Sequence, residues 1–414
     1  MKDFNSLGVP ADMVARLTEA GLTVPTPIQT RAIPAAMDGR DVLGLAQTGT
    51  GKTVAFGVPL MLALGEASGR PAPKSARGLI LAPTRELAKQ IAAALEPLRG
   101  PRKLSVVLVV GGASVSAQAG RLARGADLVV ATPGRLMDLM ERRAVDLSQT
   151  HQLVLDEADQ MLDLGFIHAL RRIAAALPRE RRTMLFSATM PKQMESLAAS
   201  FLSDPLRIEV TPPGRAVDRI VQSVHFVTKD EKITRLIGLL DSHRDERAIV
   251  FGRTKHGSEK LAKKLASEGF AVASIHGNKS QGQRDRAIRG FKDGDVRVLV
   301  ATDVAARGID IPDVKHVYNF DLPNVPEIYV HRIGRTARAG ADGAAIAFCT
   351  PEEMGELRDI QKVTGLTIPV GHGEPWERMD AARKGRGGRP SGDGKPAAGR
   401  PRRRRPQRRA QKAA

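Results

Sequence analysis

The sequence is poor in cysteine and in aromatic residues. Its 414 residues include one cysteine, Cys349, one tryptophan and two tyrosines. A single cysteine excludes an internal disulfide and every zinc site that needs two thiolates, which fits a reducing compartment. Nowhere do about 18 uncharged apolar residues run together, as a membrane-spanning helix requires. The first residues include Asp3 and no apolar stretch of signal-peptide length. We therefore expect a cytoplasmic protein that makes no membrane contact.

Acidic residues are outnumbered by basic ones, 45 against 64, which gives a net charge of +19. Apolar residues at 42% and charged residues at 26% are typical of a globular protein. The excess charge is concentrated in segment 383–414, which holds 13 basic residues and one acid and so carries +12. This distribution indicates a polyanionic partner. The run Arg402–Arg405 favours phosphate binding over a merely solubilising extension.

Short apolar runs rich in β-branched residues alternate with longer segments of helical period, and the alternation occurs twice. The pattern is typical of parallel strands buried under helices and predicts two α/β domains of similar size. The expected strands are 41–46, 78–82, 106–110, 128–131, 153–155 and 183–186 in the first half, and 221–227, 248–251, 271–275, 296–300, 316–320 and 344–348 in the second. Helices are expected between them, for example at 53–64, 85–98, 255–268 and 281–292.

Helix-breaking residues separate the two sets of strands, in the sequence Thr-Pro-Pro-Gly at 211–214. We therefore expect a first domain at 1–210, a linker at 211–217 and a second domain at 218–370. From 371 to 414 the apolar period disappears and Gly, Pro, Ala and Arg dominate, which predicts a disordered basic tail. No aromatic residue follows Trp376, so the tail is not expected to bind a polyanion through base stacking.

The segment Ala-Gln-Thr-Gly-Thr-Gly-Lys-Thr at 46–53 follows an expected strand and opens an expected helix. That is the context of a phosphate-binding loop, although Ala46 stands where the pattern usually has its first glycine. Glycines let backbone N–H groups face the phosphates, Lys52 supplies a cation, and the Thr53 hydroxyl suits Mg²⁺. The loop residues expected to contact ATP are Thr48, Gly49, Thr50, Gly51, Lys52 and Thr53.

A second nucleotide-site pattern follows further along the chain, where the apolar run Leu153–Leu155 ends in Asp156 and Glu157. At the carboxyl end of a strand, Asp156 is suited to hold Mg²⁺, partly through water, and Glu157 to polarise the attacking water. Acids at such a position also cap helices, but the upstream loop favours the nucleotide-binding interpretation. We therefore predict Lys52, Asp156 and Glu157 as catalytic residues.

Gly-Lys-Thr at 51–53 with Asp-Glu-Ala-Asp at 156–159 strongly resembles the DEAD-box ATP-dependent RNA helicases. The resemblance covers roughly residues 4–365, and within the family it is nearest to the bacterial RhlE-like subgroup, judged from the compact core and the Arg-rich tail. It implies two tandem RecA-like P-loop domains with parallel sheets. The first would be the ATP-binding domain with its Q motif, and the second the C-terminal helicase domain. It also implies RNA-stimulated ATP hydrolysis that locally unwinds short RNA duplexes.

The other motifs of the family appear in order along the chain. The resemblance implies that Gln29, whose amide both donates and accepts, pairs with adenine, and that Phe4 stacks on the ring. Leu22 stands where the family often has an aromatic residue. Ser187-Ala188-Thr189 resembles the motif that couples the ATP site to strand separation, and His331 is assigned to the same coupling.

RNA-facing loops are implied in both domains, where apolar strands meet the next helix. Helix N-termini and exposed amides at such places suit phosphate oxygens and carry no base information. The residues predicted to bind RNA are Pro83, Thr84, Arg85, Gly112, Pro133, Gly134 and Arg135 in the first domain, and Arg253, Thr254, Gln281, Arg284 and Thr302 in the second.

The second half has no phosphate loop of its own, so arginines supply its chemistry. Arg335 and Arg338 lie three residues apart and resemble the arginine fingers of the family, which reach the γ-phosphate only when the domains close. Asp310 is implied to bind the ribose hydroxyl, and Ala337 stands where glycine is frequent. ATP and single-stranded RNA are each expected to bridge the domains, so that each favours binding of the other.

Two other classes of function stay open at this point. A DNA-dependent helicase shares the two-domain plan, although Gln29 with the motif at 156–159 fits the RNA-directed family better. A non-catalytic RNA clamp would need no turnover, and the intact Lys52 and Glu157 argue against it. The physiological RNA is not identified, since ribosome assembly, cold-stress unfolding of transcripts and RNA decay all occur in the family. Ribosomal precursors or the RNA decay machinery are the corresponding partners, and a monomer is expected.

Overall fold

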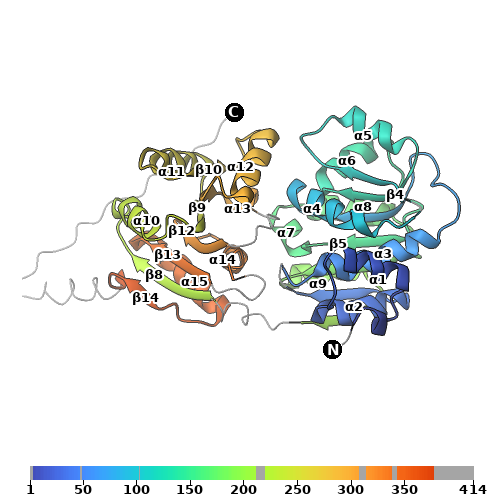
Figure 1. The fold of residues 1–414 in the computed structure, drawn as a ribbon, viewed down its shortest axis with the longest axis horizontal. Coiled ribbons are helices and arrows are strands. Elements are labelled where there is room, and N and C mark those ends of the chain that lie inside the picture. The colour runs from blue at the N-terminus through green and yellow to red at the C-terminus, as the bar shows by residue number, and fades with distance from the viewer. Residues whose placement is uncertain are drawn as a thin grey trace, which may run out of the picture. The chain divides into compact units, whose positions relative to one another are not determined.

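The computed structural model describes residues 3–46, 49–101, 103–210, 220–306, 314–337 and 343–376. Two parallel sheets, each with helices packed on it, make up this part of the chain (Figure 1). The predicted site residues Thr48, Asp310 and Arg338 lie outside the described residues, as do the predicted linker and the predicted tail beyond residue 376.

The first half contains seven strands and the helices between them. The strands are β1 (Val42–Leu45), β2 (Ala76–Leu81), β3 (Val106–Val109), β4 (Ala126–Ala131), β5 (Gln152–Leu155), β6 (Arg182–Ser187) and β7 (Leu206–Glu209). The α-helices are α1 (Ala11–Glu19), α2 (Pro27–Met37), α3 (Lys52–Glu66), α4 (Arg85–Leu95), α5 (Val115–Leu122), α6 (Pro133–Glu141), α7 (Ala158–Asp163), α8 (Ile167–Ala176) and α9 (Lys192–Phe201), with 3₁₀ turns η1 (Asn5–Leu7) and η2 (Glu96–Leu98).

The second half repeats this plan. Its strands are β8 (Ile220–Phe226), β9 (Arg247–Phe251), β10 (Val272–Ile275), β11 (Val298–Ala301), β12 (Val314–Asn319), β13 (Gly343–Cys349) and β14 (Val370–His372). Its helices are α10 (Glu231–Asp241), α11 (Lys255–Ser267), α12 (Gln281–Asp293), α13 (Asp303–Ala306), α14 (Pro326–Ile333) and α15 (Met354–Thr364), with the 3₁₀ turn η5 (Pro351–Glu353).

The two sheets have the same strand order. The first runs β3-β4-β2-β5-β6-β1-β7 and the second β10-β11-β9-β12-β13-β8-β14, so each strand of one half has a counterpart seven strands later. All strand pairs are parallel. The prediction of two tandem α/β domains with parallel sheets is therefore confirmed, and the loops that follow the strands meet at the carboxyl edge of each sheet.

Alternate side chains of each strand in the first sheet enter two different cores. On β1, Val42 belongs to a cluster that also contains residues of α1 to α4, whereas Leu43 belongs to a cluster with residues of α6, α8 and α9. This alternation follows from the two-residue repeat of a strand. Because both faces are covered, every residue of β1 and β4 is buried, and in β2 every residue except Arg77. This burial explains the apolar runs at 42–45, 78–81 and 128–131.

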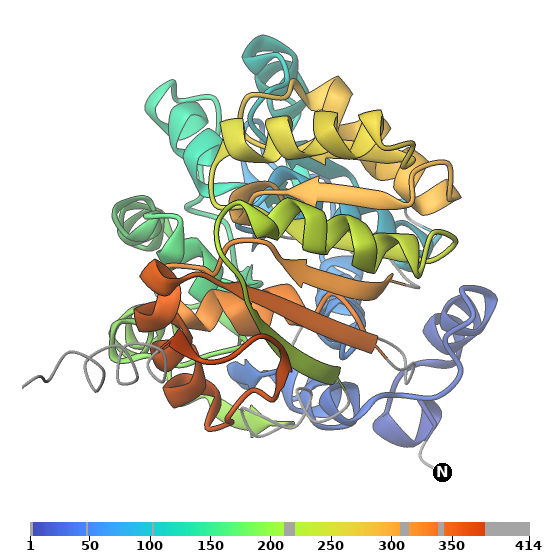
Figure 2. The same cartoon turned by 90° about the vertical axis from the view of Figure 1, so that its left-hand side faces the viewer.

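Helices cover the second sheet in the same way. Leu236 and Leu240 of α10 and Leu261 and Leu265 of α11 pack with residues of β9, β11 and β12. In Figure 2 these helices, in yellow-green and yellow, lie across the strands of that sheet. In the part of the chain that the structure describes, no helix has both the length and the apolar character needed to cross a membrane.

The sequence prediction missed two edge strands and misplaced two boundaries. On β7 only Ile208 is buried, and β14 is exposed throughout, so neither shows a strong apolar pattern. Because β14 pairs with β8, the sheet includes residues that we had assigned to the tail from 371 onward. The helix predicted at 85–98 changes to a 3₁₀ turn after Leu95 because Pro97 has no N–H to continue the α-helical ladder.

A glycine in β1 is required by the packing of the sheet. A Cβ atom on Gly44 would lie 2.5 Å from the ring of Phe186. We expect Gly44→Ala to lower the free energy of unfolding of the first half by about 1–3 kcal/mol, because overpacking forces neighbouring side chains to move. Urea unfolding followed by circular dichroism measures this change. The matched control is Gly65→Ala in α3, where a Cβ meets nothing within 4 Å. An unchanged midpoint for Gly44→Ala would show that Phe186 moves aside freely.

Candidate active site

The three predicted ATP-site segments follow strands that lie side by side. Strands β5, β6 and β1 are neighbours in the first sheet, and Asp156, Ala188 and the phosphate-loop segment come directly after them. Parallel strands end at the same edge, so segments more than 100 residues apart in sequence are brought together there. The sequence prediction that these segments form one site is consistent with this arrangement.

Lys52 and Asp156 form the centre of the site. Lys52 is the first residue of α3, and its Nζ lies 3.6 Å from Oδ1 of Asp156, with both side chains about 95% buried. At that distance the contact is a charge interaction, and in the described part of the chain this ammonium group has no hydrogen bond of normal length. A buried ammonium with unused N–H donors is suited to an incoming phosphate oxygen.

The site keeps its lysine charged. Burial alone would favour the neutral amine, but Asp156, Glu157 and Asp159 outweigh it and hold the pKa of Lys52 above its usual value. Burial raises the pKa of Asp156 to about 6, and the neighbouring Glu157 adds to that effect while Lys52 opposes it. Three acids around one lysine leave the site with excess negative charge, which is suited to a divalent cation.

Glycines shape the loop that leads into Lys52. Gly49 and Gly51 have φ values of +88° and +89°, which only glycine adopts without strain. A Cβ on Gly51 would lie 2.4 Å from Nε2 of Gln29. The loop residues that the structure describes therefore fit a phosphate-binding loop.

Gln29 connects this loop to the start of α2. Its Oε1 accepts a hydrogen bond from Thr26 N at 2.9 Å, and its Nε2 donates to Gly51 O at 3.0 Å. A primary amide has two N–H donors and two acceptor lone pairs, so one of each is left for a ligand. Phe4, in contrast, is 2% exposed and packs in the core, so stacking on an adenine ring would require it to be uncovered.

Glu157 has an unusual backbone conformation. Its φ of 52° and ψ of 51° lie in the left-handed region, which costs a non-glycine residue about 1–3 kcal/mol. Glu157 is 2% exposed and directly precedes α7. Strain of this kind concentrates at functional sites, where it fixes the direction of a side chain.

Asp159 joins the ATP site to the predicted coupling motif. Its Oδ2 accepts hydrogen bonds from Ala188 N at 3.1 Å, Thr189 N at 3.0 Å and Thr189 Oγ1 at 3.1 Å. Ser187 donates to Thr189 O at 2.6 Å and closes the turn. His331 of α14 places its Nε2 3.8 Å from the same carboxylate oxygen. The residues predicted for coupling thus meet at Asp159, a residue to which the sequence analysis gave no role.

Several predicted RNA-binding residues line one cavity of about 460 Å³. They are Pro83, Thr84, Arg85, Gly134 and Arg135, together with Arg284 of α12. Thr84 caps α4, since its Oγ1 accepts from Leu87 N, and Arg135 donates to Ala113 O and so supports the neighbouring loop. A Cβ on Gly112 would lie 2.2 Å from Nη1 of Arg85, so glycine is needed beside that guanidinium. Pro133, the first residue of α6, is buried.

Comparisons with known proteins agree with this geometry. A family model described as DEAD/DEAH box helicase matches residues 26–197, and one described as helicase conserved C-terminal domain matches residues 230–340. The chain is 42% identical over 364 residues to the DEAD-box ATP-dependent RNA helicase CshA of Geobacillus kaustophilus (strain HTA426), covering 88% of this chain and 77% of that protein. The chain belongs to the DEAD-box family of ATP-dependent RNA helicases.

Two solved structures resemble this helicase over most of its length. Dbp5 of S. cerevisiae bound to RNA and ADP BeF3 is similar with a TM-score of 0.79 and 32% identity, over 93% of this chain and 99% of that one. Mss116p bound to single-stranded RNA and AMP-PNP is similar with a TM-score of 0.82 and 29% identity, over 92% of this chain and 81% of that one. Both domains of the helicase are therefore RecA-like.

Two predicted RNA-binding residues of the second half contact α4 of the first. Gln281 Nε2 donates to Glu86 Oε1 at 2.9 Å, and Arg284 Nη2 lies 3.2 Å from Glu86 Oε2. Lys89 and Asp285 add a pair at 2.9 Å between the same helices. Thr302, at the end of β11, is buried, and Thr254 caps α11 through Gly257 N.

The arginine-rich segment of the helicase contains a buried arginine that sequence analysis missed. Arg332 is 2% exposed and makes two hydrogen bonds to the carboxylate of Asp303, at 2.5 and 2.8 Å, and one to Asn319 at 3.0 Å. The signal was available, since Tyr329, Arg332 and Ile333 share the buried face of α14 at helical spacing. The predicted finger Arg335 follows this helix and donates from Nε to His331 O at 3.3 Å.

Asp159→Asn should weaken the coupling between ATP hydrolysis and unwinding. The neutral amide loses the charge that strengthens three hydrogen bonds to the loop after β6, each of which contributes about 1.5–3 kcal/mol when the acceptor is ionised. We expect the rate of RNA duplex unwinding to fall about tenfold or more, with ATP affinity little changed. Gel-based unwinding and nucleotide titration measure the two quantities. The control is the exposed Asp163→Asn at the end of α7, and equal losses in both variants would contradict a role for Asp159.

Proposed function

We propose that the two halves of this helicase share one ATP site and one RNA-binding surface, and that closing them together drives local strand separation. The observation that carries the proposal is the buried Lys52 ammonium, which has donors to spare beside Asp156, within a site joined by Asp159 to the loop after β6. A nucleotide bound at Lys52 can therefore shift the loop after β6 through direct contacts between neighbouring residues, by way of Asp156 and Asp159.

Each ATP-site residue has a proposed role in that scheme. Lys52 binds the outer phosphates with the backbone amides of the loop at 48–53, and Gln29 and Phe4 bind adenine. Thr53 and Asp156 hold Mg²⁺, which would neutralise charge on the phosphates when bound. Glu157, held by its strained backbone, polarises the attacking water.

The second half completes the site in this proposal. Arg335 and Arg338 contact the γ-phosphate on closure and Asp310 binds the ribose, while His331 beside Asp159 senses the same movement. The predicted RNA-binding residues contact the sugar-phosphate backbone of one RNA strand. In the first half these residues lie between positions 83 and 135, and in the second half between positions 253 and 302. A duplex does not fit the closed surface, so closure separates a few base pairs.

The proposed localisation, oligomeric state, RNA substrates and subgroup rest on the sequence. We place the helicase in the cytoplasm, as a monomer, acting on ribosomal precursors, cold-stressed transcripts or decaying RNA. The Geobacillus kaustophilus relative named above is a CshA helicase. The RhlE-like subgroup stays a prediction that rests on the compact core and the Arg-rich tail.

The test is steady-state ATP hydrolysis by the full chain, alone and with single-stranded RNA or DNA of matched length. RNA is expected to stimulate hydrolysis strongly and DNA little. Glu157→Gln should lower the RNA-stimulated rate by about 10²–10⁴-fold, because the water loses its general base, while ATP still binds. Equal stimulation by DNA would favour a DNA-dependent helicase. A rate unchanged by Glu157→Gln would remove Glu157 from the mechanism.

Deleting the tail should weaken RNA binding and leave basal ATP hydrolysis unchanged. The segment 383–414 carries +12. When RNA affinity is plotted against salt concentration on logarithmic axes, the slope becomes shallower by about 0.7 for each RNA phosphate that the shortened chain no longer neutralises. Filter binding at several salt concentrations compares the full chain with a chain that ends at residue 382. Equal affinities at low salt would contradict an RNA-binding tail.

A further inference from the structure

The second half contains a counterpart of the ATP phosphate site. Because the two sheets have the same strand order, β8 and α10 correspond to β1 and α3, and the end of β12 corresponds to the end of β5. Lys52 begins α3 and faces Asp156 after β5, at 3.6 Å. Lys232, the second residue of α10, faces Asp321 after β12, at 3.2 Å. A buried lysine and an acid thus occupy matching places in both halves.

The loop before Lys232 is not built to bind phosphate. Residues 227–231 read Val-Thr-Lys-Asp-Glu and contain no glycine. The backbone N–H of Thr228 donates to Glu231 Oε2 at 2.8 Å, and its hydroxyl donates to the same oxygen at 2.7 Å. A side chain of the loop itself therefore uses the donors that a phosphate-binding loop offers to its ligand.

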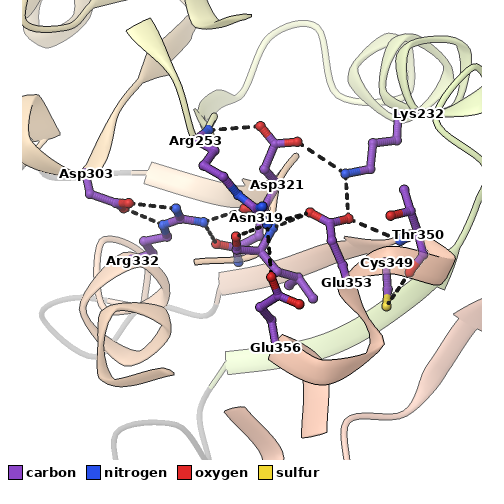
Figure 3. A network of polar contacts seen from close by, with 11 residues as sticks. Lys232, Arg253, Asp303, Asn319, Asp321, Arg332, Cys349, Thr350, Glu353 and Glu356 are labelled. Atoms are coloured by element: carbon purple, nitrogen blue, oxygen red, sulfur yellow. Dashed lines mark hydrogen bonds and ion pairs between the residues drawn. The ribbon is translucent and has the colours of Figure 1, made fainter. Parts of the chain in front are cut away.

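The carboxylate of Glu353 receives four hydrogen bonds at this place (Figure 3). Its Oε2 accepts from Lys232 Nζ at 2.8 Å and Thr350 N at 3.1 Å, and its Oε1 accepts from Leu322 N at 3.1 Å and Arg253 Nη2 at 3.2 Å. Two cations and two backbone amides around one buried anion are the donor set of a protein anion site. Glu353 itself is 5% exposed.

The position of Glu353 explains why the two halves differ. It lies four residues after the end of β13, the counterpart of β6, and the four residues after β6 read Ala-Thr-Met-Pro at 188–191. None of these side chains carries a negative charge, so Lys52 keeps its donors for a substrate. Glu353 instead takes up the ammonium group of Lys232 and part of the guanidinium of Arg253.

We propose that the Glu353 carboxylate fills the second half's counterpart of the phosphate site as a built-in anion, and thereby confines nucleotide phosphate to the first half. A smaller, uncharged residue at this position would leave a cavity that accepts small external anions. Access is available, because Lys232 and Glu353 line a cavity of about 650 Å³ that also includes Lys229, Thr254 and Lys260. The basic side chains at its rim would attract such anions.

The test is rescue of a Glu353→Ala variant of the full chain by formate and by inorganic phosphate. Loss of the carboxylate leaves Lys232 and two amides without this partner, and the melting temperature should fall by about 6–12 °C. Formate and phosphate should each restore several degrees in a saturable way, measured against chloride at equal ionic strength. The matched control is Glu352→Ala, whose exposed side chain lines the same cavity without these four bonds.

The rise in melting temperature that formate and phosphate cause in the native chain and in Glu352→Ala is the background for this comparison, because phosphate is also expected to bind at the ATP site. An equal response to both anions in all three proteins, or none in Glu353→Ala, would overturn the proposal. Rescue by formate alone would also overturn it, since a phosphate-type site must take a tetrahedral anion. If Glu353→Ala can be recovered only in the unfolded state, its refolding yield replaces the melting temperature. The proposal then requires that formate and phosphate each raise this yield above that in chloride, and more than they do for the native chain and Glu352→Ala.

Discussion

A buried ammonium group is stable only where counter-charges meet it, and each half of this helicase is built around one such lysine. Lys52 and Lys232 are 6% and 3% exposed, and both lie where a helix begins beside the end of a parallel strand. Burying an ammonium ion without a counter-charge would cost several kcal/mol. Acidic side chains at the same edge of the sheet are therefore required. The parallel sheets supply them, because they bring the ends of distant strands together.

The two halves meet this requirement to different degrees. Lys52 has Asp156 near it but no hydrogen-bonding acceptor in the described residues, whereas Lys232 is bound by Asp321 and Glu353. An ammonium group that is stabilised by nearby charge without a hydrogen bond can bind a substrate phosphate without breaking an existing bond. Lys232 already donates two hydrogen bonds to carboxylates, which a phosphate would have to replace. The same architecture thus gives a binding site in one half and a rigid structural centre in the other.

The coupling proposed for the first half rests on the same proximity of strand ends. Asp159 lies three residues after Asp156, in the first turn of α7, and holds the loop after β6 through three hydrogen bonds. Any change in the position of α7 on nucleotide binding must therefore move Ala188 and Thr189 or break those bonds. The proposed coupling needs no long pathway, since one carboxylate in the segment after β5 holds the loop after β6 directly.

Sequence was sufficient for those features that are local or continuous. Buried strands such as β2 and β4 stand out because each contains an unbroken apolar run, at 78–81 and 128–131, that is buried on both faces of the sheet. The phosphate loop and the acids after β5 are short patterns with fixed spacing. Edge strands were missed because β7 buries one side chain, Ile208. The partners of Arg253 and Gln29 could not be read from sequence, since Glu353 lies 100 positions from Arg253 and Gly51 lies 22 from Gln29.

Arg253 shows how the structural centre can serve the RNA-binding surface. Sequence analysis predicted that it binds RNA, and in the structure its Nη2 is held by Glu353 and by Leu322 O at 3.0 Å, with 37% of its side chain exposed. A guanidinium has five N–H donors, and these contacts use only one of its three nitrogens. The Glu353 carboxylate therefore fixes the direction of the arginine and leaves two of its nitrogens for a phosphate oxygen. The predicted RNA contact would then cost less side-chain entropy.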